Sequence, residues 1–341
     1  MDIISERIGL SPRVFCTQQS PHGLGGVIAS LDTNETRIST KALSICIVTL
    51  QARDYLRQCL ESIYANPYSG PIEIIVIDNH SQDGTLEFLR QEYPNISVIE
   101  NDHNAGYTLP NNQGLRLAQG DYLMLLNPDT LVLPGGLDGL VNFMEKHPEA
   151  GICGPKVLNR DGSLQQPCRR GEPRPLAVIS YFLGLSRLFP KSKVLGGYLL
   201  NYLPEDETHL VAGVSGSCML IRREVINQIG YLDERFFAYQ EDTDFCLRAR
   251  QAGWQIVYYP RVSIIHYGGK GGTRVEPYHS ILAWHKSYFL YYRKNLARDY
   301  FFLFNWLYYG AMLLKFLSSL FINLFRREKF AGPQRNIKDS R

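Results

Sequence analysis

A carboxylate directly follows an uncharged apolar segment near the middle of the chain. Residues 122–126 read Tyr-Leu-Met-Leu-Leu, and Asn127, Pro128 and Asp129 come next. A short run without charge predicts a strand buried on both faces, and the Asn-Pro pair predicts a turn at its end. Asp129 would then lie at the carboxyl end of a central strand, where open α/β sheets bind ligands. A carboxylate there suits a divalent cation beside phosphate oxygens, so we infer a phosphate-bearing substrate.

Three more acids lie together at the start of a predicted helix: Glu241, Asp242 and Asp244. The helix dipole favours acids at this position, and Asp244 and Arg248 have the i,i+4 spacing of a stabilising pair. We therefore interpret Asp244 as structural. A carboxylate can take a proton from a reacting group, so the other two acids are candidates for a general base.

Polar residues also follow two other predicted strands. Asp78 ends the strand at 72–78 and could accept a hydrogen bond from a base or a ribose. Asp83, just before the next helix, is interpreted as a helix cap. After the strand at 96–99, Gly106 would let the backbone approach a ligand closely. These loops converge with Asp129 at one edge of the sheet, which indicates a single binding site.

The elements that position these residues alternate regularly from residue 43. Such alternation predicts an α/β fold with a mainly parallel sheet, right-handed crossovers and a nucleotide-type half. The predicted strands are 43–49, 72–78, 96–99 and 122–126, and the predicted helices are 54–63, 84–92 and 111–119.

Composition limits the class of protein. The chain has 341 residues, 45% hydrophobic and 20% charged, which is typical of a globular enzyme. A net charge of only +3 argues against a nucleic-acid partner. The seven cysteines are an odd number without a CxxC pair, so we expect reduced, buried thiols in the cytoplasm. Residues 1–40 have no continuous apolar core and are expected to form a poorly ordered extension without a signal peptide.

Several basic or titratable residues have two open interpretations. His266 follows a predicted strand and precedes a Gly/Lys loop at 268–272; a strand-end histidine is usually structural, but that loop suits a lid over a diphosphate. Arg169 and Arg170 could contact an acceptor phosphate or be solvated.

Six segments, taken in order over residues 43–270, resemble the family 2 glycosyltransferases, and among them the bacterial rhamnosyltransferase-type branch. Two positions depart from the family pattern. Asn127 stands where the usual metal motif has its first Asp, and Leu50-Gln51 stand where an aromatic and Asn are frequent. The matching segments are 47–49, 76–85, 104–114, 126–130, 215–223 and 236–248.

The resemblance implies a GT-A nucleotide-sugar-binding fold over residues 41–275, with a donor half at 41–130 and an acceptor half at 131–275. It implies that Asp242 is the catalytic base, supported by Glu241, and that Asp129 and His266 bind Mg²⁺ or Mn²⁺. The segment 213–222 resembles the acceptor side, and a buried strand is its alternative. The implied donor contacts are Thr49, Asp78, Asn104, Gly106, Asn112, Asn127 and Asp129, and the implied acceptor contacts are Gly216, Ser217 and Arg222.

These features predict an inverting, metal-dependent glycosyltransferase. By resemblance, it would move rhamnose from deoxythymidine diphosphate rhamnose to a polyprenyl-linked or cell-surface glycan. Another nucleotide-sugar transferase, galactosyl or glucosyl, is an alternative. An inactive glycan- or nucleotide-binding partner subunit is another, but the intact Glu241-Asp242 pair argues against it. A nucleotidyltransferase would need a Gly-rich triphosphate loop after the first strand, and residues 49–53 contain no Gly.

The C-terminal region, residues 276–330, predicts amphipathic helices followed by a polar tail at 331–341. Residues 301–325 contain no acid, and five polar residues form one stripe at helical spacing. An in-plane helix at the inner face of the cell membrane is favoured. Packing on the catalytic domain or on a second subunit is an alternative, and a single span is least favoured, because Lys315 would lie near its midpoint. The stripe is Asn305, Tyr308, Lys315, Ser319 and Asn323, and the basic flank that would meet anionic lipid is Arg326, Arg327 and Lys329.

Overall fold

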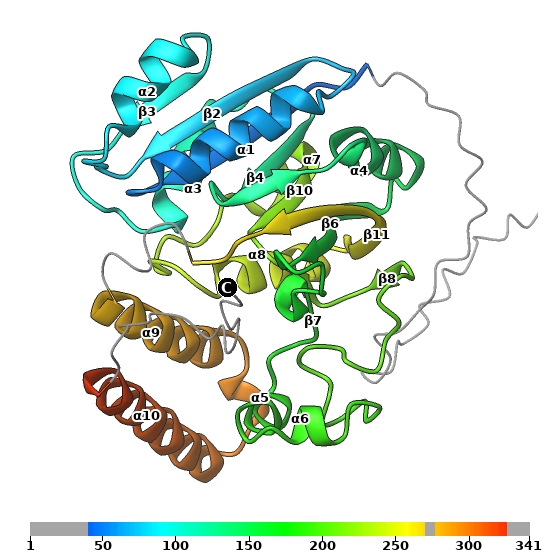
Figure 1. Cartoon of the computed structure of the whole chain (residues 1–341). Coiled ribbons are helices and arrows are strands. Elements are labelled where there is room, and N and C mark those ends of the chain that lie inside the picture. Colours follow the sequence, from blue (N-terminus) through cyan, green and yellow to red (C-terminus); the bar gives the residue numbers. More distant parts are fainter. Residues whose placement is uncertain (1–39, 270–276, 326–341) are drawn as a thin grey trace, which may run out of the picture.

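The computed structural model of the chain describes residues 40–269 and 277–325. These residues form an α/β part with a smaller helical layer beneath it in Figure 1. The predicted N-terminal extension, apart from residue 40, and the predicted polar tail lie outside the described residues, as do Arg326, Arg327 and Lys329.

The described strands form a nine-stranded sheet in the order β3-β2-β1-β4-β10-β6-β11-β5, with β8 paired to β11. A second, two-stranded sheet pairs β7 with β9. The central strands β1 and β4 are uncharged and buried, as the apolar runs predicted. The bounds are β1 (Leu43–Thr49), β2 (Ile72–Asp78), β3 (Ser97–Glu100), β4 (Tyr122–Leu126), β5 (Thr130–Val132), β6 (Ala150–Leu158), β7 (Arg169–Arg170), β8 (His209–Leu210), β9 (Gly213–Val214), β10 (Cys218–Arg222) and β11 (Gln255–His266).

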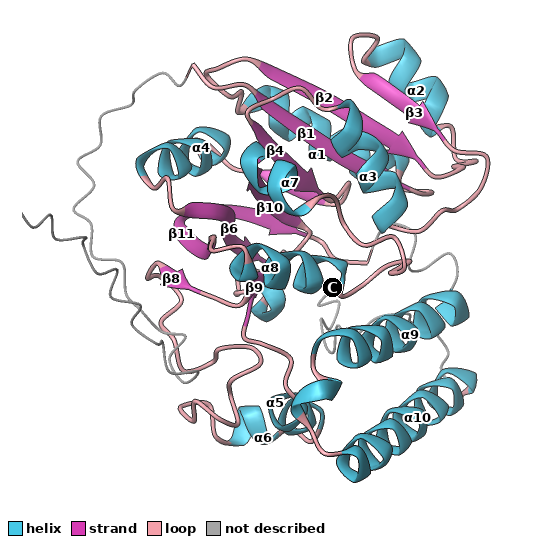
Figure 2. Cartoon of the chain, turned by 180° about the vertical axis from the view of Figure 1, so that it is seen from behind, coloured by secondary structure: helices cyan, strands magenta, loops and turns pink. Residues whose placement is uncertain are grey.

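Helices cover both faces of the large sheet. α1 lies in front of it in Figure 1, whereas α3, α7 and α8 lie in front in the opposite view of Figure 2. The helix predicted at 111–119 begins earlier, at Thr108, because Pro110 falls in its first turn, where no intrahelical N–H bond is lost. The bounds are α1 (Arg53–Ala65), α2 (Thr85–Glu92), α3 (Thr108–Leu117), α4 (Gly136–Lys146), α5 (Pro175–Phe182), α6 (Leu185–Leu188), α7 (Arg223–Ile229), α8 (Glu241–Gln251), α9 (Pro277–Asn295) and α10 (Phe302–Leu324).

The directions of β1 to β4 agree with the predicted mainly parallel sheet. β1 pairs in parallel with β2 and β4, and β2 pairs in parallel with β3. β10 is antiparallel to both β4 and β6. This reversal brings the amino end of β10 to the carboxyl end of β4, since Cys218 lies opposite Leu126.

The helical layer is tied to the α/β part through α8. The Nζ of Lys294 on α9 lies 2.7 and 2.8 Å from the two carboxylate oxygens of Asp244, which is fully buried. Arg248 contacts the same carboxylate at 3.1 Å, as the i,i+4 spacing predicted. The hydroxyl of Ser287 donates to the carbonyl of Ala238 at 2.7 Å. α9 is thus fixed against both α8 and the loop that precedes it.

α10 packs on α9 through its polar stripe. The amide of Asn305 accepts a hydrogen bond from the Tyr292 hydroxyl and donates to the carbonyl of Ala297 at 2.9 Å. Tyr308 and Asn323 are the buried residues of this helix. The stripe therefore faces the protein and the apolar side faces outward. Among the described helices, α10 is the one whose length and apolar composition would allow it to cross a membrane.

The cysteines agree with the predicted reduced state. The six described cysteines are free and buried, and Cys16 lies outside the described residues. Burial raises the pKa of Cys46, Cys59 and Cys218 to about 12, which makes these thiols unreactive.

Candidate active site

Strand pairing brings the polar strand ends to one edge of the sheet. β1 and β2 end together, with Thr49 opposite Asp78. The N–H of Asn127, just after β4, donates to the carbonyl of Ser217, just before β10, at 3.0 Å. β11 brings its last residue, His266, alongside the start of β5. The loops after β1, β2, β4 and β11 therefore meet the loop before β10.

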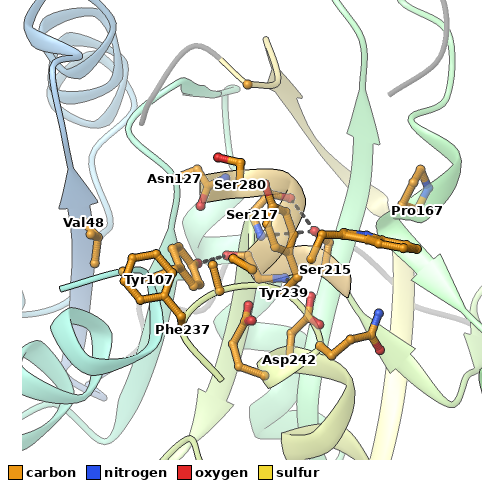
Figure 3. Close-up of a pocket in the computed structure, with 18 of the residues that line it drawn as sticks. Val48, Tyr107, Asn127, Pro167, Ser215, Ser217, Phe237, Tyr239, Asp242 and Ser280 are labelled. Carbon is orange, nitrogen blue, oxygen red and sulfur yellow. Dashed lines mark hydrogen bonds between the residues drawn. The ribbon is translucent and has the colours of Figure 1, made fainter. Parts of the chain in front are cut away.

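A cavity of about 350 Å³ opens at this edge. Figure 3 shows Asn127, Ser217 and Asp242 around it, each from a different element. One end of the cavity is polar and the other is aromatic. The predicted site residues that line it are Thr49, Asn104, Gly106, Asn127, Asp129, Gly216, Ser217, Glu241, Asp242 and His266.

Gln165 fixes which nitrogen of His266 carries the proton. The amide nitrogen of Gln165 donates to Oδ1 of Asn159 at 3.2 Å and to the backbone carbonyl of His266 at 3.3 Å. Its Oε1 must therefore accept, and its partner is Nδ1 of His266 at 2.7 Å. Nδ1 therefore carries a proton, and Nε2 is the ring nitrogen left to coordinate a cation. Nε2 lies 3.1 Å from Oδ1 of Asp129 and 3.2 Å from Nδ2 of Asn127.

This corner has the character of a divalent cation site. An imidazole nitrogen and a carboxylate oxygen face each other at close range, and both are ligand types that divalent cations take in proteins. The hydrogen bond from Nδ1 of His266 to Gln165 orients the ring, as the hydrogen bonds of metal-binding histidines do. Oδ1 of Asn127 is buried and has no hydrogen-bond partner among the described residues. Those residues contain no group of three or more His, Cys, Asp or Glu side chains that could hold a metal alone.

The carboxylate of Asp242 is held from both sides. Its Oδ2 accepts from the guanidinium of Arg170 and from the N–H of Gly216, the latter at 3.0 Å. Its Oδ1 accepts from the N–H of Thr243 at 2.7 Å and from the Thr243 hydroxyl at 3.1 Å. Arg170 also donates to the carbonyl of Val214 at 3.0 Å. Asp242 thus lines the cavity with a fixed orientation.

Glu241 lies beside Asp242 but has a different environment. Burial, reinforced by the negative charge of Asp242, raises the pKa of Glu241 to about 8. Its Oε2 is buried and has no hydrogen-bond partner among the described residues. Glu241 is therefore mainly protonated at neutral pH.

A strained turn presents both acids to the cavity. Tyr239 and Gln240 have φ angles of 68° and 63°, in the left-handed region that non-glycine residues seldom adopt. Two such residues in succession cost on the order of 1–3 kcal/mol each and are typical of functional sites. The turn ends at Glu241, so the first turn of α8 starts inside the cavity wall.

Gly106 has a different role from the one predicted. Its φ is 87°, and a Cβ atom there would lie 2.3 Å from the carbonyl oxygen of Phe237. The N–H of Tyr107 donates to the same oxygen at 2.7 Å. Gly106 lines the cavity, but the close approach it permits is to the loop before α8. It therefore joins the donor-side loop to the strained turn.

Two predicted contacts lie outside the cavity lining. The amide of Asn112 donates to the carbonyl of Leu232 and to Glu234, each at 2.9 Å. Arg222 ends β10, opposite Tyr122 at the start of β4, and therefore lies at the other end of the sheet. Because β10 is antiparallel, its amino end faces the site. The structure thus corrects both predictions: these side chains hold backbone segments together.

Asp78 also lies outside the lining, directly beside it in register with Thr49. Its Oδ2 accepts from the N–H of Ser81 at 2.9 Å, and burial raises its pKa. Its Oδ1 and the Thr49 hydroxyl are buried without a hydrogen-bond partner among the described residues. Of these two residues, Thr49 lines the cavity and Asp78 lies behind it.

Sequence reasoning missed several lining residues. Arg170 contacts Asp242, which agrees neither with solvation nor with a free phosphate-binding role. Arg169 is also buried, under the carbonyls of Leu203 and Pro204, with its guanidinium 4.8 Å from the Tyr258 ring. No local signal marked Gln165. The missed aromatic lining residues are Tyr107, Tyr181, Phe182, Tyr198, Phe237, Tyr239, Trp284 and Tyr288.

Comparison with known proteins agrees with this geometry. Residues 44–230 match the family described as glycosyl transferase family 2, and residues 203–325 match glycosyl transferase family group 2. The chain is 30% identical over 263 residues to the N-acetylglucosaminyl-diphospho-decaprenol L-rhamnosyltransferase of Mycobacterium tuberculosis, covering 74% of this chain and 84% of that protein. It is 26% identical over 235 residues to the rhamnosyltransferase WbbL of Escherichia coli, covering 65% and 82%.

The fold is also shared with a solved glycosyltransferase. The mannosyltransferase PcManGT of Pyrobaculum calidifontis, solved with GDP-Man and Mn²⁺, superposes with a TM-score of 0.51 at 16% identity. The match covers 75% of this chain and 65% of that one. The predicted GT-A fold class, with its mostly parallel central sheet and C-terminal helices, is confirmed. This chain is therefore a family 2 glycosyltransferase of the rhamnosyltransferase-like type, an enzyme that uses a nucleotide-sugar donor.

Proposed function

We propose that this enzyme transfers a rhamnosyl group, with inversion and with the help of a divalent cation, from a nucleoside diphosphate donor to a polyprenyl-linked glycan. The observation that carries the proposal is that Asp129 and His266 at one wall, and Asp242 at another, line the same cavity. The similar mycobacterial enzyme is named for rhamnosyl transfer to a diphospho-decaprenol acceptor.

Asp129 and His266 would hold the cation, which is Mg²⁺ or Mn²⁺. Nε2 of His266 and the carboxylate of Asp129 are the ligand atoms that would hold it, and the similar mannosyltransferase was solved with Mn²⁺. When bound, such a cation neutralises charge on the diphosphate leaving group. The protein offers these ligands from two strand ends only, so phosphate oxygens of the donor would complete the coordination.

Asp242 would act as the general base. The acceptor hydroxyl oxygen forms the new bond to the anomeric carbon, the bond to the diphosphate oxygen breaks, and the hydroxyl proton passes to Asp242. Glu241, mainly protonated at neutral pH, places no second negative charge beside this carboxylate. Arg170 and the N–H of Gly216 keep the carboxylate in position.

We place the enzyme at the inner face of the cell membrane. Trp306, Leu307 and Leu314, on the outward side of α10, are 73%, 73% and 69% exposed. Such a continuous apolar face is typical of helices that lie in the lipid interface. The basic residues Arg326, Arg327 and Lys329 follow this helix in the sequence and suit anionic head groups.

Two assays test this function in sequence. Purified full-length enzyme with Mn²⁺ is first screened for hydrolysis of nucleotide sugars, and deoxythymidine diphosphate rhamnose should be cleaved fastest. Transfer is then measured to a diphospho-polyprenol carrying one sugar. Fastest cleavage of a galactosyl or glucosyl donor would reassign the sugar. Donor binding without hydrolysis or transfer would instead identify an inactive partner subunit.

A further inference from the structure

One end of the active-site cavity is a cluster of aromatic rings from three segments. Tyr181 and Phe182 end α5, Tyr198 comes from the loop that follows α6, and Trp284 and Tyr288 belong to α9. Ring centroids lie 5.7 Å apart for Phe182 and Trp284, 5.3 Å for Trp284 and Tyr288, and 5.5 Å for Tyr181 and Tyr198. We refer to these five residues as the aromatic cluster.

The aromatic cluster is continuous with the catalytic end of the cavity. Glu241 and Asp242 line the same cavity as Trp284 and Tyr288. Ala283 and Leu199 add further apolar surface. Any occupant of the aromatic cluster would therefore be joined, without an intervening wall, to the place where an acceptor hydroxyl must meet Asp242.

The aromatic cluster is also continuous with the apolar exterior. Phe182 is followed directly by Leu183, which is 69% exposed. The ammonium group of Lys315 on α10 lies 4.8 Å from the centroid of the Phe182 ring and 5.2 Å from that of Trp284. The two rings thus adjoin the inward side of the same helix whose outward side carries Trp306 and Leu314. A hydrocarbon chain that left the aromatic cluster on this side would pass the Lys315 ammonium group and reach the exposed Leu183.

We infer that the aromatic cluster holds the first isoprenoid units of the acceptor lipid and guides its chain outward between α5 and α9. This rests on the proposed transfer to a polyprenyl-linked acceptor and assigns a subsite for its lipid part. Hydrocarbon fits because ring faces and methyl groups offer apolar contact, worth about 0.8 kcal/mol per buried CH₂ group. The hydroxyl groups of the three tyrosines could also contact a glycan, and the tests below therefore include a sugar phosphate as the competing occupant.

The first test measures the benefit of chain length. Acceptors with the same sugar diphosphate on a short alkyl, a citronellyl or a farnesyl group are compared, below their micelle concentrations. In the wild type, KM should fall as the chain lengthens. In Trp284→Ala and Phe182→Ala, the KM ratio between short and farnesyl acceptors should shrink by about tenfold or more. Tyr64→Ala, which removes an exposed ring of α1, is the matched control and should keep the wild-type ratio.

The second test needs no catalysis. The full-length chain with Trp254→Phe and Trp306→Phe keeps Trp284 as its single tryptophan. Titration with farnesyl phosphate should change its emission in a saturable way, and adding Phe182→Ala should raise the Kd at least tenfold. Thermal unfolding of each variant verifies the fold.

The outcomes separate this inference from the proposed function. Saturable binding without transfer to any acceptor would overturn the proposed function and keep the lipid subsite. If transfer occurs with a KM that does not depend on chain length, and farnesyl phosphate does not change the tryptophan emission, the proposed lipid subsite is wrong. An equal emission change with the sugar phosphate alone would show that the aromatic cluster holds a glycan, which also overturns it.

Discussion

The guanidinium of Arg170 donates a hydrogen bond to Oδ2 of Asp242 within the wall of the cavity. Both side chains are about nine-tenths buried, and the attraction between them offsets part of the free energy needed to bury each charge. The pair joins the short β7–β9 sheet to α8, and it fixes the acid that we assign as the base. Its integrity should therefore affect both stability and turnover.

Arg170→Met should destabilise the protein by about 3–5 kcal/mol, because it leaves the Asp242 carboxylate buried without its ion pair. The double variant Arg170→Met/Asp242→Asn should recover part of that loss, since no unpaired charge remains. Urea unfolding of the four proteins in the cycle measures the coupling. Additive losses in the double variant would show that the ion pair does not couple the two residues.

Asp242→Asn should reduce turnover by on the order of 100-fold or more and leave nucleotide-sugar affinity nearly unchanged. Asparagine keeps the shape of the side chain but cannot take the acceptor proton. Steady-state kinetics and calorimetric titration of the donor separate the two effects. An equal loss of donor affinity would move Asp242 from the acceptor side to the donor site.

Asp129→Ala should abolish transfer and weaken Mn²⁺-dependent donor binding while the fold remains intact. Gln165→Leu, which removes the orienting partner of His266, should weaken Mn²⁺ binding by about 10- to 100-fold. Calorimetry with Mn²⁺ and a nucleoside diphosphate measures both changes. Asp138→Ala, which changes an aspartate outside the cavity, is the control. Full activity of Asp129→Ala, or of chelator-treated wild type, would refute the metal assignment.

Glu241→Gln should stabilise the protein increasingly as pH rises from about 4.5 to about 8. The folded wild type retains the Glu241 proton up to about pH 8, because burial raises its pKa, whereas an unfolded glutamate releases it near its ordinary value of 4.5. Wild-type stability is therefore lost across this window, and glutamine removes the loss, which should reach several kcal/mol. Urea unfolding at several pH values measures it. A pH-independent difference between the two proteins would contradict the raised pKa.

The outward face of α10 should be needed for membrane binding but not for folding. Replacing Trp306, Leu307 and Leu314 together with Gln should abolish sedimentation with anionic liposomes and leave the melting temperature within a few degrees, because these side chains are exposed. Tyr308→Gln, on the buried face, should lower the melting temperature instead. Wild-type binding should weaken as salt rises and keep an apolar remainder. Unchanged liposome binding by the triple variant would refute the anchoring role.

The sequence predicted the first half of the sheet and its helices, since uncharged strands and amphipathic helices leave strong periodic patterns, but it did not predict β6 or α4. It also placed Asp129, Asp242 and His266 at one site. Arg222 failed because the direction of β10 is decided by its long-range pairing with β4, which no local pattern encodes. Arg170 and Gln165 could not be found, because their roles depend on partners 72 and 101 residues away in the chain.

The contact between Asp244 and Lys294 has a consequence for the order of synthesis. Asp244 is fully buried about half a helical turn from Asp242. The Lys294 ammonium group that contacts it lies 50 residues later in the chain. A nascent chain that has not yet reached α9 would leave this carboxylate with Arg248 alone, and the rear of α8 uncovered. The catalytic helix thus receives this support from a segment synthesised 50 residues later, so a chain that stopped before α9 would carry Glu241 and Asp242 but would leave the buried Asp244 without its contact to Lys294.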